Sequence, residues 1–397
     1  MTTNRTPYDQ DPARQEAFAE FGAAVFGHLP RQDQRRWART YLTGLLGTPG
    51  KKSLRRMAAA VSDVPTASQS LHQFISMSPW PWEPSRTALA RWTEQRAEVR
   101  AWSLLPVVTP KRGQYSVGVQ QAFDAEAGRV VNCQVGVSLL LSTCCDDLPV
   151  DWRLQLPEAW CEDPGLRRRA RLPDTAAPRP LWSLGLELVD AQTLRAEGPP
   201  LPVVADAREF TDVRALVNGL GGRGTRFVVA VADNLTMRVG PHLGTQRRAG
   251  TPLPAGRLCV DDRLLHRSAP TRAHTSQGRH GQAAVVWTLS GPVHLPRTDQ
   301  TLRLLAAWCP KNSRPTGIWL TNLPCADIDE MIALAGTQPG TAGVTQPLRE
   351  HFGLSDFEGR SFPGWHHHKT LVSAAYTWHR LSTATTCTHT SGSQAAA

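Results

Sequence analysis

The sequence contains no apolar run of 18 residues, which argues against a membrane-spanning helix. The first residues, Met1 to Pro7, also lack the charged segment followed by an apolar segment that marks a signal peptide. With neither feature present, we expect a cytoplasmic protein that has no membrane partner.

Familiar metal-binding and nucleotide-binding motifs are missing as well. The eight cysteines show no C-x-x-C spacing, and Cys144 and Cys145 are adjacent, which suits neither a disulfide framework nor a zinc ribbon. No P-loop, dinucleotide glycine fingerprint, H-E-x-x-H or G-x-S-x-G motif occurs. The glycines from Gly219 to Gly224 lack a following Lys-Ser/Thr, so we interpret them as a turn. We expect the cysteines to be buried or incidental thiols.

Lysine is scarce, since Lys51, Lys52, Lys111, Lys311 and Lys369 are the only ones among 44 basic residues. The formal net charge is +10, which favours a polyanionic partner. An arginine excess also follows from a GC-rich genome, so this charge does not locate a binding site. The basic run of residues 167–171 has two interpretations, a solvated surface or a phosphate-facing patch.

Apolar spacing changes from helical to strand-like along the chain. Hydrophobic residues make up 41% of the sequence, enough for a sizeable core. Residues 1–95 show helical spacing, for example at Phe18, Phe21 and Val25. From Trp102 onward, β-branched and small residues predict strands. We therefore predict a helical N-terminal DNA-binding region over residues 1–100.

The middle of the chain alternates strands and helices. Strands are predicted at 107–108, 115–119, 130–141, 152–156, 203–206 and 226–231, and helices at 181–191 and 213–220. The strand, helix and strand that end at residue 231 indicate a parallel β-α-β unit. Asp206 stands at the end of the first of these two strands.

The C-terminal third contains an insertion and then helices. We predict a β-rich insertion over 235–322, with strands at 283–289, 302–308 and 317–320. Helices are predicted at 327–335, at 345–352 and from Gly364 through Trp378. Residues 101–234 and 323–381 would then be two parts of one domain, and residues 382–397 a disordered tail.

One stretch near the C-terminus is especially specific. Residues 356–371 read Asp-Phe-Glu-Gly-Arg-Ser-Phe-Pro-Gly-Trp-His-His-His-Lys-Thr-Leu. This stretch resembles the closing signature of bacterial insertion-sequence transposases of the DDE type. Residues 54–57, 74–80, 110–119, 132–137 and 156–163 resemble other parts of the same family in the same order. The resemblance extends from about Leu29 to Leu381.

The resemblance implies both a fold and a chemistry. It implies an RNase H-like α/β fold, a mixed sheet flanked by helices, with a helical N-terminal domain and a β-rich insertion. Such enzymes cut and rejoin double-stranded DNA with two divalent metals, usually Mg²⁺, held by three carboxylates. A transposase must pair two DNA ends, so family analogy also implies a homodimer.

Only one of the three implied carboxylates is found in register. The family's first Asp pair falls on Leu105 and Pro106, and the second carboxylate falls on Asp206. The third should be a Glu seven residues before the basic residue Arg349, but Ala342 stands there. We therefore expect DDE catalysis to be lost or severely impaired. Substitute carboxylates could come from Asp124, Asp146, Asp147, Asp233, Glu350 or Asp356.

Candidate DNA contacts are basic residues in or near the matched segments. They are Lys51, Lys52, Arg55, Arg56, Lys111, Arg112, Arg349, Arg360 and Lys369. Consecutive residues on a helix point in different directions, so His366, His367 and His368 cannot converge on one metal ion. We expect the three histidines to be structural or DNA-facing.

Three functional hypotheses follow. The first is a transposase-family DNA-binding protein in which cutting is lost or impaired. The second is an active, Mg²⁺-dependent transposase with an unconventional carboxylate site around Asp206. The third is a protein-interaction or structural role without DNA contact, against which the basic charge argues mildly.

Overall fold

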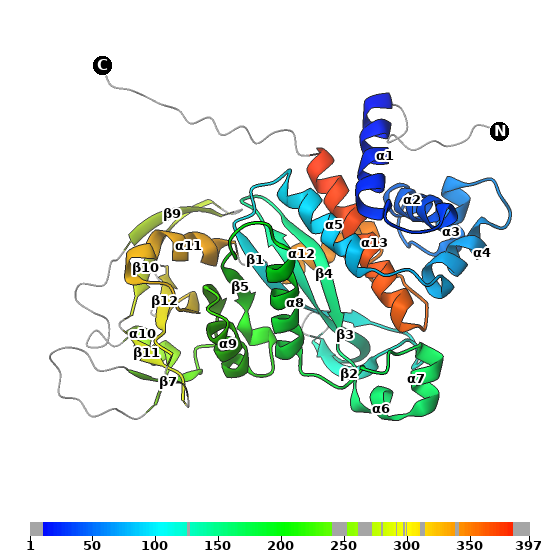
Figure 1. Ribbon diagram of the computed structural model, residues 1–397. Coiled ribbons are helices and arrows are strands. Elements are labelled where there is room, and N and C mark those ends of the chain that lie inside the picture. The colour runs from blue at the N-terminus through cyan, green and yellow to red at the C-terminus, as the bar shows by residue number, and fades with distance from the viewer. Residues whose placement is uncertain are drawn as a thin grey trace, which may run out of the picture.

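One large mixed sheet with helices on both faces forms the centre of the molecule (Figure 1). A computed structural model describes residues 11–124, 128–239, 252–260, 272–278, 281–290, 292–296, 298, 300–309, 314–337 and 341–383. The helical N-terminal region lies at one end of the sheet, and the strands of the predicted insertion lie at the other (Figure 1).

The N-terminal region is helical, as its apolar spacing predicts. Its elements are α1 (Pro12–Phe26), α2 (Gln32–Gly47), α3 (Leu54–Val61), α4 (Ala67–His72), a π-helix (Gln73–Met77) and α5 (Glu83–Glu94). Side-chain caps fix two of the helix starts. The Asp11 carboxylate accepts from the backbone N–H of Ala13, and the Ser53 hydroxyl accepts from that of Arg56. Such caps satisfy backbone donors that have no partner inside the helix.

Five strands reproduce the order expected of an RNase H-like sheet. They are β1 (Ala101–Pro110), β3 (Arg129–Ser142), β4 (Asp147–Leu154), β5 (Val203–Asp206) and β6 (Phe227–Ala230). β3 lies antiparallel between β1 and β4, while β5 runs parallel to both β1 and β6. The spatial order is therefore β4, β3, β1, β5, β6. This arrangement confirms the predicted fold class.

Helices cover both faces of these strands. α8 (Leu181–Arg195) and α9 (Val213–Gly222) connect the strands between β4 and β6. α9 is the crossover of the predicted parallel β-α-β unit, which the pairing of β5 with β6 confirms. On the opposite face, α11 (Ile328–Gly336) packs against Ala101, Val204 and Val228. The core is therefore buried from both sides of the sheet.

Strands of the segment predicted as an insertion extend the same sheet. The sheet continues beyond β6 with β13 (Gly317–Thr321), β12 (Arg303–Trp308), β10 (Gly281–Leu289) and β9 (Arg272–Gly278). Three short strands form a small separate sheet, β11 (Val293–His294), β7 (Thr236–Val239) and β8 (Leu253–Pro254). A short helix, α10 (Ala255–Val260), follows β8.

Two local predictions were wrong. The strand predicted at 115–119 is a turn that leads into β2 (Val119–Asp124), because Gly118 has a φ of +70°. A Cβ at Gly118 would lie 3.1 Å from the Leu154 side chain, so the chain turns where only glycine fits. The predicted tail also begins too early, since α13 (Phe362–Thr383) continues through residue 383. The rest of that tail, residues 384–397, lies outside the described residues.

Candidate functional site: the β1–β5–α12 region and the signature helix

The positions of the first two implied carboxylates lie on the neighbouring strands β1 and β5. Their parallel register pairs Ser103 with Val204 and Leu104 with Ala205. The next residues along the two strands, Leu105 and Asp206, are therefore level and share one face of the sheet. Leu105 is 2% exposed and belongs to the hydrophobic core, and Pro106 is also buried. An apolar side chain thus stands beside the remaining carboxylate.

The Asp206 carboxylate is already engaged by its own neighbours. It caps a 3₁₀ turn (Ala207–Glu209) by accepting from the backbone N–H of Arg208 at 3.1 Å. The Arg208 guanidinium also donates to both carboxylate oxygens, through Nε at 2.7 Å and through Nη2. This bidentate pair neutralises the charge that a divalent cation would need.

An acidic residue that sequence reasoning missed lies next to Asp206. Burial and the neighbouring charge of Asp206 raise the pKa of Glu209. Glu209 ends the 3₁₀ turn that Asp206 caps, which explains their coupling. The only available signal was its separation of three residues from Asp206. That spacing alone does not show that the charge of one carboxylate affects the pKa of the other.

The helix α12 (Thr341–Phe352) is the element implied to carry the third carboxylate. Its Arg349 guanidinium donates to the backbone carbonyl of Val108 on β1 at 2.6 Å, which holds α12 against that strand. Ala342, the position of the implied Glu, is the second residue of α12, and its side chain lies outside the described residues. β1 thus contacts both β5 and α12, while the sequence places apolar residue types at the implied metal-binding positions on β1 and α12.

Most of the proposed substitute carboxylates are committed elsewhere. Asp356 accepts from the backbone N–H of Lys52 at 2.7 Å, and Asp146 pairs with Arg380. Asp147 accepts from the Ser142 hydroxyl, and burial raises its pKa to about 6. Glu350 and Asp233 line two other pockets. The Asp124 side chain lies outside the described residues.

These residues do not fit a pair of Mg²⁺ ions. Among the described residues, no three His, Cys, Asp or Glu side chains are grouped so that they could hold a metal ion. Mg²⁺ demands a near-octahedral shell of oxygens, and a two-metal site needs several shared carboxylates. Asp206, held by Arg208, supplies one carboxylate to this region.

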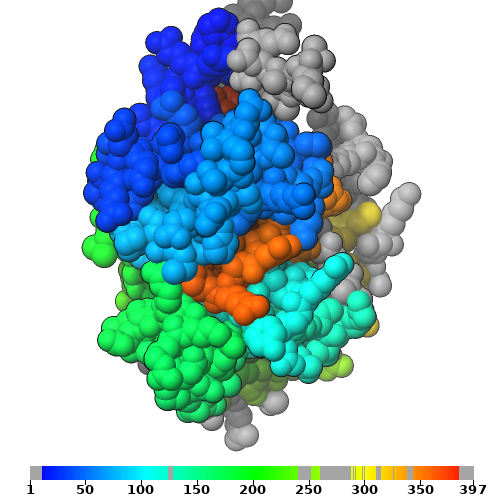
Figure 2. Space-filling view, turned by 90° about the vertical axis from the view of Figure 1, so that its right-hand side faces the viewer, coloured from blue at the N-terminus to red at the C-terminus, as the bar shows by residue number. Residues whose placement is uncertain are grey.

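The second half of the signature stretch begins a buried helix between the helical region and the sheet. α13 contacts α2, α5 and the π-helix on one side and β4 on the other. Each residue from Gly364 to Trp378 is buried. Figure 2 shows an orange segment at the surface between the blue helices and the cyan and green segments, where the C-terminal part of the chain joins them. A helix buried all round is central to the fold.

Each of the three histidines of α13 has a different set of partners. His366 stacks on Trp82 with ring centroids 4.4 Å apart, and its Nδ1 accepts from Arg86 at 3.0 Å. His367 stacks on Trp80 at 3.8 Å and faces the backbone carbonyls of Ile75 and Trp80. The residues 74–80 and the signature stretch are therefore two halves of one buried contact.

His368 completes this contact toward α2 and α12. Its Nε2 donates to the Gly353 carbonyl at 3.0 Å, so its Nδ1 accepts from the Tyr41 hydroxyl at 2.9 Å. Burial lowers the pKa of all three histidines. Of the two roles expected for the histidines, structural or DNA-facing, their burial supports the structural one.

A buried ion cluster joins the same elements. Arg86 of α5 donates to Asp151 of β4 at 2.7 Å, and both side chains are at most 1% exposed. Arg153 and Arg195 also pair with Asp151. Burial lowers the pKa of Arg86 to about 10. Burial alone would raise the pKa of Asp151, but the three arginines hold it well below its usual range.

Two of the predicted DNA contacts are buried, which argues against a DNA-facing role for them. Lys369 donates to the Leu354 carbonyl and lies over the rings of Trp152 and Trp365. Lys52 donates to the Thr48 carbonyl. Neither ammonium faces the surface, because each satisfies backbone groups inside the fold.

The other predicted DNA contacts differ in their exposure and in whether they already form hydrogen bonds or ion pairs. Lys111 is half-buried, donates to the carbonyls of Ser355 and Phe357, and has a pKa that burial lowers to about 8. Lys51 pairs with Glu358 at 2.6 Å. Among the predicted residues, those exposed on the surface without an ion pair in the described chain are Arg55, Arg56, Arg112 and Arg360.

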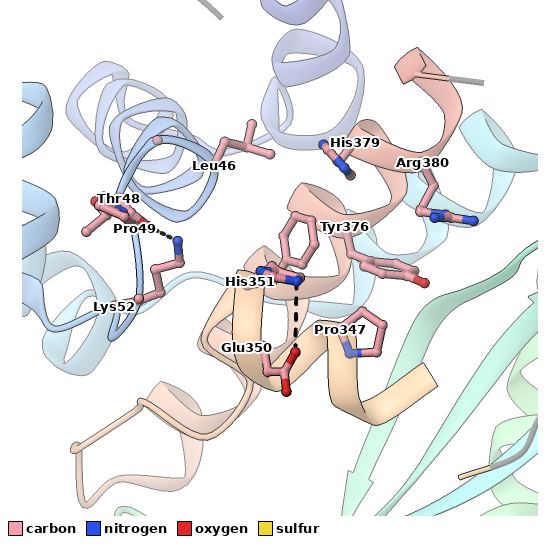
Figure 3. A pocket seen from close by; sticks show the side chains of 13 residues that line it. Leu46, Thr48, Pro49, Lys52, Pro347, Glu350, His351, Tyr376, His379 and Arg380 are labelled. Carbon is pink, nitrogen blue, oxygen red and sulfur yellow. Dashed lines mark hydrogen bonds and ion pairs between the residues drawn. The ribbon is translucent and has the colours of Figure 1, made fainter. Parts of the chain in front are cut away.

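A pocket of about 560 Å³ opens where the helical region meets the C-terminal helices (Figure 3). It is lined by the loop after α2 and by α12 and α13, including Lys52, His351 and Arg380. The Lys52 ammonium turns toward the backbone of Thr48, away from the pocket's acidic residue Glu350 (Figure 3). Asp206 is not among the lining residues, so this pocket is distinct from the carboxylate position.

Comparison with known families agrees with the fold. The family model described as DDE superfamily endonuclease matches residues 24–288. This match spans more than half of the chain, so the chain belongs to the DDE superfamily endonucleases. A search of curated proteins finds no match. Enzymes of this superfamily act on DNA and use divalent metals, usually Mg²⁺.

Among the residues that the structure describes, no helix is long and apolar enough to cross a membrane.

Proposed function

We propose that this protein is a transposase-related, DNA-binding member of the DDE endonucleases in which ordinary two-metal cleavage is lost or severely impaired. The observation that carries this proposal is the pairing of Asp206 with Arg208 beside the apolar Leu105. DNA is the substrate class of the family, and the net charge of +10 favours such a polyanion. By family analogy alone, the proposal includes a homodimer.

The loss follows from charge and geometry. Two divalent cations about 4 Å apart repel each other and are held together only by several shared anionic oxygens. Here the carboxylate of Asp206 has a guanidinium as its partner, and the residue level with it on β1 is a leucine. Binding a metal ion would require Arg208 to leave and further ligands to arrive.

The alternative is an active metal-dependent transposase with an unconventional carboxylate site. Glu209 favours this alternative, because its pKa is raised partly by the charge of Asp206. Two neighbouring carboxylates could hold one cation if Arg208 moved away. Asp206 and Glu209 would then both be needed for activity.

Two assays test the proposal. Duplex DNA binding is measured by fluorescence anisotropy at about 150 mM salt, and nicking of supercoiled plasmid is measured with Mg²⁺ and with Mn²⁺. We expect binding without metal-dependent nicking, and the same nicking background in the Asp206→Ala variant. Absence of duplex binding would contradict the DNA-binding part. Nicking that both Asp206→Ala and Glu209→Gln abolish would support the active alternative instead.

A further inference from the structure

An exposed aromatic ring with two arginines against it marks one face of the molecule. Tyr115 is 58% exposed, although large apolar side chains usually turn inward. The guanidinium carbon of Arg169 lies 5.2 Å from its ring centroid, and that of Arg360 lies 5.0 Å from it. We call Tyr115, Arg169 and Arg360 the Tyr115 patch.

The patch is assembled from three distant parts of the chain. Tyr115 lies in the turn before β2, Arg169 in α7 (Pro164–Ala170), and Arg360 in the signature stretch before α13. Figure 2 shows the cyan, green and orange segments meeting on this face, below the blue helical region. Nearby α6 (Glu158–Glu162) completes the green segment.

The arginines around the patch divide into structural and free ones. Arg167 donates to the carbonyls of Cys161 and Ala176, and Arg171 donates to the carbonyl of Ser76. Arg169 and Arg360 are exposed, and within the described chain neither forms an ion pair with a carboxylate. The acidic residue closest in sequence to Arg360, Glu358, pairs with Lys51.

The two guanidinium groups lie against one ring and have no carboxylate partner in the described chain, so they are available to bind an anion. A guanidinium within about 6 Å of an aromatic centroid is attracted by the ring, so Tyr115 fixes both arginines in place. The two positive charges lie close to the same ring and repel each other, and an anion bound by both guanidinium groups would relieve this repulsion. Arginine also suits phosphate because its planar fork can donate two parallel hydrogen bonds.

We propose that the Tyr115 patch binds the phosphate backbone of double-stranded DNA, with Tyr115 acting as the positioning residue for Arg169 and Arg360. This inference rests on the proposed function and assigns its DNA contact to a specific surface. It also gives the exposed end of the signature stretch a binding role, while the buried end holds the fold together. Phosphate contacts of this kind fix where a protein lies on DNA without reading the sequence.

Salt dependence of binding tests the two arginines. The full chain is titrated with a labelled duplex oligonucleotide between about 50 and 200 mM salt. We expect the double variant Arg169→Ala/Arg360→Ala to bind more weakly and to have a log–log salt slope shallower by about two. The control Arg214→Ala/Arg314→Ala removes the same charge from exposed positions on α9 and before β13, and should behave like the wild type.

The tyrosine is tested separately. Tyr115→Ala leaves both charges in place but removes the ring that positions them. We expect weaker binding with an unchanged salt slope, because the number of phosphate contacts stays the same. Tyr115→Phe keeps the ring and should restore wild-type affinity.

The outcomes separate this inference from the proposed function. If the wild type does not bind duplex DNA, both are overturned. If the wild type binds, and Arg55→Ala/Arg56→Ala reduces the salt slope while Arg169→Ala/Arg360→Ala does not, DNA lies on α3 and this inference alone is overturned. Binding of the wild type to a single-stranded oligonucleotide but not to the duplex is a case of the first outcome and overturns both.

Discussion

Two aspartates of this protein pair with arginine in different surroundings. The Asp206 side chain is 15% exposed and pairs with one arginine from its own turn. Asp151 is buried and pairs with three arginines from three different elements. The first pair neutralises a position implied to bind metal, while the second connects α5, β4 and α8. The same kind of ion pair therefore affects a single position at Asp206, but holds three elements of the fold together at Asp151.

Removing the charge of Asp151 should destabilise the protein strongly. We expect Asp151→Asn to lower the free energy of unfolding by about 3–5 kcal/mol, because Arg86 would remain buried without its counter-ion. Urea denaturation measures this difference. In the control Glu330→Gln, the exposed pair with Arg226 is lost, and the change should stay below about 1 kcal/mol. Equal effects of the two variants would show that the buried cluster does not hold the fold together.

At the scale of elements, the course of helix α13 could be predicted from the sequence, whereas its burial could not. Its start near Gly364 and its course through Trp378 were predicted from the pattern and the signature. The burial of residues 364–378 was not, because the sequence left the three histidines either structural or DNA-facing and predicted that Lys369 contacts DNA. The aromatic partners Trp80 and Trp82 lie far away in the sequence, and nothing in the local pattern shows that they stack on these histidines.

Neutral histidines inside α13 should make stability depend on pH. Burial lowers the pKa of His367 to about 4, from 6.5 in the unfolded chain. Between these values the unfolded state takes up a proton that the folded state does not, so stability falls as the pH drops from 6.5 to 4. For His367 alone, the loss is about 3 kcal/mol. Unfolding free energies of the wild type and His367→Gln, measured from pH 7.5 to pH 4.5, should differ in slope.

The wild type must be compared with His367→Gln because Asp147 changes the stability of both proteins with pH in the direction opposite to His367. Burial raises its pKa to about 6 from 3.8, so its protonation in the folded state adds stability as the pH falls through 6. This contribution is common to both proteins and cancels in the difference. Parallel pH profiles would contradict the proposed role of His367 as a neutral, buried group.

At the scale of the whole molecule, the sheet could be predicted well and the site only in part. Strand β5 with Asp206 at its end, the crossover α9 and strand β6 follow from short apolar runs and the turns between them. The apolar pattern of one strand does not determine its register with a neighbouring strand. Only the structure therefore shows that Leu105 of β1 lies beside Asp206 of β5. The pairing of Arg208 with Asp206 was equally hidden, since the sequence does not show whether an arginine two residues after an aspartate points toward its carboxylate.

Long basic side chains were the least predictable part of the molecule. Lys52 and Lys369 turn inward to backbone carbonyls, whereas Arg169 and Arg360 remain at the surface around Tyr115. Charge alone does not distinguish these cases, because lysine and arginine stems can lie along apolar surface in either direction. The proposal of a DNA interface at the Tyr115 patch therefore depends on the folded arrangement of these segments.

The central claim is that this member of the DDE family cannot hold a metal pair at the position of Asp206. The most direct measurement is Mn²⁺ binding to the full chain in the presence of duplex DNA, followed by electron paramagnetic resonance, for the wild type and Asp206→Ala. The account predicts the same weak, non-stoichiometric binding for both proteins. Two tightly bound Mn²⁺ ions in the wild type that disappear in Asp206→Ala would contradict it.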